Sequence, residues 1–142
     1  MALPDLKTVE TQVRACTSCG LADTRTQAVP GEGSYTAELL FVGEGPGYHE
    51  DRQGRPFVGP AGKLLDKLLT SIGLDRENVY ITNMVKCRPP NNRDPFPSEL
   101  KACSGYLDTQ MKLISPRIIV SLGRHSLERF FPNETISKAR GK

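Results

Sequence analysis

Three short apolar runs, separated by loops and helical patterns, constrain the fold of this chain most strongly. ELLFVG at 38–43 is a candidate for a buried strand, and NVYITNMV at 78–85 and PRIIVSLG at 116–123 are predicted as the second and third strands. Strands that alternate with helices indicate βαβ units, right-handed crossovers and a parallel sheet. We therefore predict an α/β fold in a single domain over 1–142. Three strands make a thin sheet, and we expect its last strand to be missing.

Helical patterns fall before, between and after these runs. Residues 3–15 predict a first helix, the segment from Pro97 predicts one of about 15 residues, and GRHSLERFF at 123–131 begins another. The clearest pattern, at 60–73, predicts an amphipathic helix that Gly73 closes. We expect its inward face to consist of Leu64, Leu65, Leu68, Leu69 and Ile72.

A loop rich in glycine and proline follows the first predicted strand, VGEGPGYHEDRQGRPFVGPAGKLL at 42–65. It is no Walker A loop, because Gly62-Lys63 lacks the Ser or Thr that must follow. It is no dinucleotide fingerprint either, because Tyr48 occupies the place of the last glycine. The acidic side chains in this loop would also repel a phosphate. The loop therefore favours close backbone approach to a flat or uncharged ligand, with carboxylates held for chemistry.

Three segments should meet at one edge of the predicted sheet. Ligands of parallel sheets bind beyond the carboxyl ends of the strands. Residues 43–57 follow the first run, Asn83 lies near the end of the second, and Gly123-Arg124 ends the third. A polar amide in an apolar strand is costly without partners, so Asn83 is a candidate ligand-binding residue. An isolated Asn is more commonly a turn or capping amide, and that alternative stays open.

Charge and terminal sequence bound the partners and the location. The net charge is +3, from 19 Lys and Arg against 16 Asp and Glu, which permits a polyanionic partner without requiring one. No apolar run approaches the length of a membrane span, and MALPDLKTVETQV has no signal-peptide pattern. We expect a cytoplasmic monomer with no membrane partner.

The four cysteines, Cys16, Cys19, Cys87 and Cys103, suggest a metal site. Structural disulfides are rare in a reducing compartment, and a C-x-x-C pair with two further cysteines is typical of metal binding. The spacing is neither that of a zinc ribbon nor that of a ferredoxin. Zinc, a [4Fe–4S] cluster and ordinary buried thiols therefore remain open on spacing alone.

Several motifs together resemble the iron–sulfur type of uracil-DNA glycosylase, known as family 4. They are GEGPGYHED, GRPFVGPAGKLL, TNMVKCRPPNNRDP and SLGR, with the four cysteines at that family's intervals. The resemblance covers the chain from Cys16 to Gly141. It implies a three-layer α/β/α sandwich with a central parallel sheet and four cysteine ligands for a structural [4Fe–4S] cluster. It also implies a base excision repair enzyme that hydrolyses the N-glycosidic bond of deoxyuridine in DNA, releasing uracil and leaving an abasic site.

The resemblance also implies which residues bind the base. Phe57 would stack on the pyrimidine, a contact worth roughly 1–3 kcal/mol. Asn83 would read uracil by accepting a hydrogen bond from N3–H and donating one to O4, a pattern that cytosine reverses. Gly43 and Gly45 would let backbone N–H groups approach uracil O2, where negative charge grows as the base leaves.

Charged residues of the same motifs are candidates for catalysis and for DNA contact. Cleavage needs a carboxylate near C1′, and Glu44 is the first choice and Glu50 the second. Either could instead be a solvated loop acid. The residues that could contact phosphates are Lys86, Arg88, Arg93, Arg124, Lys138 and Arg140, although such a scattered set is usually solvated surface. Arg88 and Arg93 are the better candidates because they flank a proline-rich loop beside a cysteine. We expect His49 to face solvent.

One family motif has no counterpart in this sequence. The family carries a His-Pro loop after a fourth strand, whereas His49 and His125 do not precede a proline. The resemblance thus implies a C-terminally incomplete domain, and we expect these 142 residues alone to be weakly active or inactive. Three alternatives remain. They are a superfamily member with altered base specificity, a noncatalytic DNA-binding or polymerase-associated module, and a zinc-stabilised α/β domain.

Overall fold

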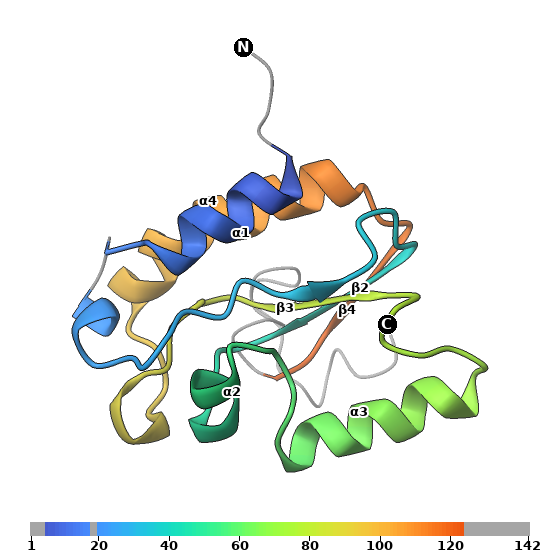
Figure 1. Ribbon diagram of the computed structural model, residues 1–142, viewed down its shortest axis with the longest axis horizontal. Helices are drawn as coiled ribbons and strands as arrows, with labels where there is room; N and C mark the ends of the chain where they lie inside the picture. Colours follow the sequence, from blue (N-terminus) through green and yellow to red (C-terminus); the bar gives the residue numbers. More distant parts are fainter. Residues whose placement is uncertain (1–4, 18–19, 124–142) are drawn as a thin grey trace.

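A four-stranded sheet forms the centre of a computed structural model that describes residues 5–17 and 20–123 (Figure 1). The strands are β1 (Glu32–Gly33), β2 (Leu39–Gly43), β3 (Tyr80–Asn83) and β4 (Ile118–Ser121). Their spatial order is β1-β3-β2-β4, with β2 parallel to both β3 and β4. The parallel sheet predicted from the three apolar runs is confirmed. The short β1, antiparallel to β3, was missed because two residues carry no apolar period.

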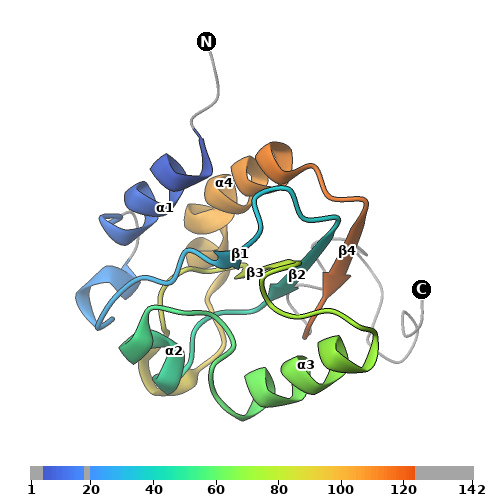
Figure 2. The same cartoon turned by 45° about the vertical axis from the view of Figure 1, so that its right-hand side comes forward.

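Helices cover both faces of the sheet, which confirms the three-layer sandwich (Figure 2). On one face lie α1 (Leu6–Arg14) and α4 (Pro97–Ile114), and on the other lie α2 (Tyr48–Gln53) and α3 (Pro60–Ser71). Two 3-10 turns, η1 (Gly20–Asp23) and η2 (Pro90–Asn92), complete the described elements. In the described ranges, no helix is both long and apolar enough to cross a membrane.

The helix predictions hold for three elements and missed one. The helices α1, α3 and α4 lie where the patterns placed them, and α4 is longer than predicted, at 18 residues. The six-residue α2 was missed because it is enclosed by glycines, with Gly47 as its N-cap and Gly54 at a φ of 72° as its C-cap. The helix predicted at 123–131 lies outside the described residues from position 124 onward.

The predicted inward face of α3 was partly wrong. Leu65 and Leu69 are buried, but Leu64, Leu68 and Ile72 are 59%, 56% and 62% exposed. Adjacent residues of a helix point about 100° apart, so one contact stripe cannot bury both Leu64 and Leu65. The stripe that packs against the sheet runs through Leu65 and Leu69. The side chains of Leu64, Leu68 and Ile72 lie outside this contact.

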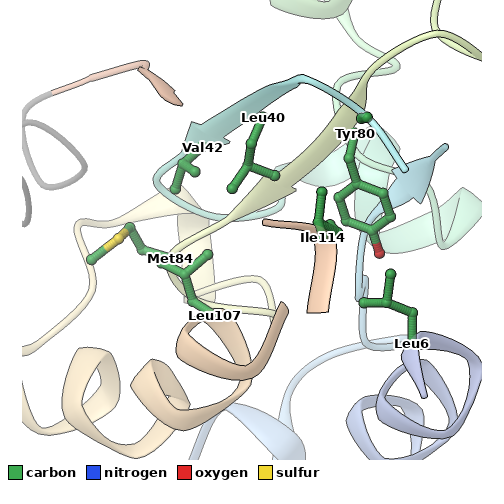
Figure 3. Close-up of a cluster of buried hydrophobic side chains, with 8 residues drawn as sticks. Leu6, Leu40, Val42, Tyr80, Met84, Leu107 and Ile114 are labelled. Atoms are coloured by element: carbon green, nitrogen blue, oxygen red, sulfur yellow. The ribbon is translucent and has the colours of Figure 1, made fainter. Parts of the chain in front are cut away.

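The two inner strands, β2 and β3, are buried on both faces, and the residues of β2 alternate between two cores, whereas Ile118 and Ile119 of β4 are exposed. Leu40 and Val42 belong to the core beneath the α1–α4 layer, whereas Phe41 belongs to the core beneath α3. Figure 3 shows the first core, in which side chains of β2, β3, α1 and α4 meet. Double-sided burial explains why these strands read as continuous apolar runs, and it fixes the strand ends that carry the site.

Candidate active site

The ends of β2 and β3 place Gly43 and Asn83 side by side. The two residues are register partners, and the N–H of Met84 donates to the carbonyl oxygen of Gly43 at 2.8 Å. A Cβ atom at position 43 would lie 2.5 Å from Asn83 Oδ1 and 2.5 Å from Phe57 Cζ. Only glycine leaves room here. The amide and the aromatic ring, predicted to share one crevice, therefore converge on the same glycine.

Phe57 has a backbone conformation that its neighbours enforce. Its φ of 52° lies in the left-handed region, which costs a non-glycine residue about 1–2 kcal/mol. Arg76 donates to the carbonyl oxygens of Phe57, at 2.8 Å, and of Pro56. At the start of α3, a Cβ on Gly62 would lie 1.8 Å from the Phe57 oxygen. The carbonyl side of Phe57 is thus clamped while its ring edge reaches Gly43.

A cavity of about 270 Å³ opens at this convergence. Its walls come from the loop after β2, including Glu44 and Glu50, from Phe57, from Asn83, and from the proline-rich loop after β3. Pockets for drug-sized ligands begin at about 300 Å³, so this volume suits a single planar ring.

The Asn83 side chain is buried without a partner in the described part of the chain. The residue is 2% exposed and lines the cavity, and its bond to Lys86 Nζ, at 2.7 Å, is made by the backbone oxygen and not by the side-chain amide. A buried unsatisfied amide costs about 1–3 kcal/mol, and such groups call for a ligand or another explanation. A carboxamide offers one acceptor oxygen and two donors, which complement a ring edge with an N–H beside a carbonyl.

Lys86 forms a buried network beneath Asn83. Its ammonium donates to Thr82 Oγ1 at 2.6 Å, to the Asn83 oxygen and to Gln110 Oε1 at 2.8 Å. Gln110 Nε2 and Thr82 Oγ1 in turn donate to the carbonyl oxygen of Pro30. Burial lowers the pKa of Lys86 to about 7. The prediction that Lys86 contacts phosphate was wrong, because its 1% exposure leaves it inside the fold.

The two candidate carboxylates differ in surroundings. Glu50 Oε2 accepts from the N–H groups of Val58 and Gly59 at 3.0 and 2.8 Å, and Oε1 accepts from Gly47 at 2.9 Å. Partial burial opposes ionisation of Glu50, but these N–H groups outweigh it and hold its pKa below the usual value. Glu50 therefore organises the loop around α2.

Glu44 lies between the carboxyl ends of β2 and β4. A Cβ on Gly123 would lie 3.4 Å from its Cγ, and its backbone oxygen accepts from Val85 at 3.0 Å. Both glutamates line the cavity, but the carboxylate of Glu50 accepts from three backbone N–H groups, so the geometry favours Glu44 for chemistry. His49 is exposed, as predicted.

The two arginines predicted to contact DNA differ as well. Arg93 forms a two-point ion pair with Glu99 at 2.8 and 2.9 Å, and its guanidinium lies 3.7 Å from the centre of the Phe96 ring. Arg88 has no such acid partner among the described residues and lies against the ring of Tyr48.

Three of the four cysteines surround one tyrosine, and Cys19 lies outside the described residues. Burial raises the pKa of Tyr106 to about 12, and a hydrogen bond to Cys16 and the electrostatic effect of the nearby Cys16, Cys103 and Cys87 add to this rise. Arg25 Nη1 donates to Cys87 Sγ at 2.9 Å.

The described residues contain no group of three metal-ligating side chains close enough for a single ion. An iron–sulfur cluster spaces its thiolates around several iron atoms, so this result does not conflict with one. The sulfur-only donor set around Tyr106, with Arg25 donating to one sulfur, fits a thiolate-bound cluster.

Comparison with known proteins points to one family. The profile described as Uracil DNA glycosylase superfamily matches residues 30–142. Proteins named type-4 uracil-DNA glycosylase from Sulfurisphaera tokodaii, Saccharolobus solfataricus and Archaeoglobus fulgidus are 53%, 52% and 49% identical over 99% of this chain. The chain spans 66%, 68% and 73% of the lengths of these three relatives.

Proposed function

This chain belongs to the uracil-DNA glycosylase superfamily and, within it, to the type-4 enzymes, and we propose that its cavity binds and releases uracil from DNA. The family is one of DNA-repair hydrolases that act on N-glycosyl bonds. A base inside a duplex cannot be reached, so such an enzyme must extrude the nucleotide into a pocket.

The buried, unpartnered carboxamide of Asn83 carries this proposal. Its oxygen accepts from N3–H of uracil and its NH2 donates to O4, which supplies the hydrogen bonds that the described protein lacks. Cytosine presents the opposite pattern and leaves both amide groups mismatched. Phe57 stacks on the ring, since its edge lies beside the same glycine as the amide.

The remaining cavity residues support hydrolysis at C1′. The water oxygen bonds to C1′ while the C1′–N1 bond breaks. The electron pair of the C1′–N1 bond leaves with uracil. Glu44 stabilises the positive charge that builds up on the sugar, orients the water and takes one proton from it as the C1′–O bond forms. Glu44 then returns this proton to solvent, and the uracil anion takes up one proton from solvent. We expect backbone N–H groups at Gly43 and Gly45 to donate to uracil O2, where negative charge grows as the base leaves.

We also propose that Cys16, Cys19, Cys87 and Cys103 hold a [4Fe–4S] cluster. When bound, it supplies a covalent link between the segment after α1, the loop after β3 and α4. Arg25 donates to Cys87 Sγ, and Tyr106 forms a hydrogen bond with Cys16. The cluster takes no part in the hydrolysis.

Two measurements on the 142-residue chain test the proposed function. The first is uracil release from single-stranded oligonucleotides under single-turnover conditions, which detects slow cleavage. The second is the affinity for an oligonucleotide with one 2′-fluoro-deoxyuridine, which resists cleavage, against the same oligonucleotide with thymidine. We expect tighter binding of the deoxyuridine analogue and uracil release at a measurable, low rate. Equal affinity for both oligonucleotides, together with no release, would refute the proposal.

A further inference from the structure

Two arginines and a tyrosine form a cationic cluster on the surface, which we call the rim cluster (Tyr48, Arg52 and Arg88). Tyr48 is the first residue of α2 and is 45% exposed. The guanidinium carbons of Arg52 and Arg88 lie 4.8 and 5.4 Å from the centre of its ring. Contacts of this kind hold an arginine in place while its N–H groups stay available to another acceptor.

The rim cluster borders the cavity. Tyr48 follows Gly47, and Arg88 precedes Pro89, and both of these neighbours line the cavity. Arg88 Nε also donates to Oδ1 of Asn92, a third lining residue, at 2.8 Å. The cluster thus connects α2 with the loop after β3, two segments that lie beside each other in Figure 1.

The positive charge of this cluster is not neutralised by the part of the chain that the structure describes. Arg55, Arg76 and Arg93 each form an ion pair with a carboxylate. No ion pair of this kind joins Arg52 or Arg88 to a described acid. Two guanidinium groups against one ring repel each other, and an anion between them relieves that repulsion. Guanidinium groups recognise phosphate oxygens with two parallel N–H donors.

We propose that the rim cluster binds the phosphodiester backbone of the DNA strand that carries the extruded nucleotide. This inference rests on the proposed function, because a base in the cavity places its flanking phosphates at the mouth. Tyr48 is partly exposed, so it can also contact a neighbouring base or sugar. Sequence reasoning pointed to Arg88 and Arg93. The present proposal keeps Arg88 and adds Arg52, and the prediction for Arg93, which lines the cavity and pairs with Glu99, stays a prediction.

The salt dependence of binding tests this proposal. We would measure the affinity for the 2′-fluoro-deoxyuridine oligonucleotide by fluorescence anisotropy across a series of salt concentrations. Each phosphate contact on a single strand contributes about 0.7 to the slope of log K against log salt. We expect Arg52→Gln and Arg88→Gln each to weaken binding at low salt and each to reduce the slope by about 0.7. Arg52→Lys should retain the slope, and Tyr48→Leu should weaken binding.

Arg117→Gln is the matched control. It removes the same charge from an exposed arginine just before β4, at the opposite end of the strands from the cavity. We expect it to leave the slope unchanged. Unchanged slopes in both Arg52→Gln and Arg88→Gln, in proteins that melt like the parent, would overturn the proposal.

The outcomes separate the two proposals. If the arginine variants lower the slope but retain the preference for deoxyuridine over thymidine, the cavity and the rim cluster both act as proposed. If the parent chain shows no such preference and releases no uracil while the slopes still fall, the proposed function fails and the rim cluster stands as a nucleic-acid contact. If the parent chain prefers deoxyuridine but the arginine variants have unaltered slopes, the rim-cluster proposal is refuted and the proposed function is not.

Discussion

Arg76 donates a 2.8 Å hydrogen bond to the carbonyl oxygen of Phe57, 19 positions earlier in the chain. The same guanidinium pairs with Glu32 and Asp66, which hold it in a fixed orientation. Phe57 occupies a left-handed conformation, so the clamp determines where its ring stands. A residue outside the cavity wall therefore positions the residue expected to stack on the base.

Loss of this clamp should weaken base binding. We expect Arg76→Gln to weaken the binding free energy for the deoxyuridine analogue by about 1–3 kcal/mol, which raises the Kd about 5- to 150-fold. The reason is that Phe57 can then relax from its strained backbone. Arg55→Gln is the control, since Arg55 also pairs with Glu32 but makes no hydrogen bond to Phe57. Equal effects of the two substitutions in the anisotropy assay would show that the ion pair, and not the clamp, matters.

Asn83→Leu should separate stability from recognition. The amide lacks a partner in the described protein, so an apolar side chain of similar size should leave the melting temperature unchanged or raise it. The same substitution should abolish the preference for deoxyuridine. Thr82→Val is the contrast, because Thr82 donates to Pro30 and accepts from Lys86, and its loss should cost about 1–3 kcal/mol. A large thermal destabilisation by Asn83→Leu would mean that its amide has a structural partner.

Gly62→Ala should disturb Phe57 although alanine favours helices. A Cβ at this position would lie 1.8 Å from the Phe57 oxygen, so the loop or α3 must shift. We expect lower stability and weaker binding of the deoxyuridine analogue. Gly105→Ala in α4 meets no atom within 4 Å and should stabilise the protein by about 0.5–1 kcal/mol. Thermal melts of both variants check the opposite signs.

Stability should depend on Glu50 in a defined pH range. Because its folded-state pKa is depressed, its contribution is fully present above the usual Glu pKa and is lost as pH falls through the lower folded value. We expect Glu50→Gln to cost about 1 kcal/mol at neutral pH, limited by solvent screening, and to cost progressively less in acid. Urea unfolding at several pH values measures this difference. A cost that stays constant down to the lowest pH would argue against a charge effect.

Metal analysis distinguishes the proposed cluster from zinc. We expect anaerobically purified protein to contain iron and sulfide in equal amounts and to absorb broadly in visible light. Cys103→Ser should reduce the iron content and lower the melting temperature, because a ligand of a buried site is lost. Zinc in place of iron in the parent protein would contradict the proposal.

The sequence predicted those parts of the fold that depend on apolar runs and glycine spacing. The strands ending at Gly43 and Asn83 were recognisable because double-sided burial makes them apolar throughout, and the edge of a parallel sheet then places both residues together. The position of Phe57 in the loop between α2 and α3 was indicated by family resemblance. Its left-handed backbone was not foreseeable, since contacts from Arg76 and Gly62 enforce it.

Other features depend on tertiary contacts that no local pattern carries. Lysine is seldom buried, so nothing in the sequence marked Lys86 as the centre of an internal network. Nothing in the sequence distinguished Arg52 from an ordinary surface arginine, because its contact with Tyr48 depends on the helix α2, which was not predicted. The exposed Leu64 and Leu68 show that leucine spacing alone cannot determine which stripe of a helix meets the sheet.

The pairing of Gly43 with Asn83 has a consequence for how the chain reaches its native state. Side chains alternate along a strand, so a slip of β3 by one residue against β2 would turn Asn83 to the opposite face and set Thr82 or Met84 beside the glycine. A misaligned sheet could be nearly as apolar, but it would have no amide in the cavity. A bound base would therefore stabilise only the correct alignment. A nucleotide ligand would in this way shift the equilibrium from misaligned sheets toward the native strand register.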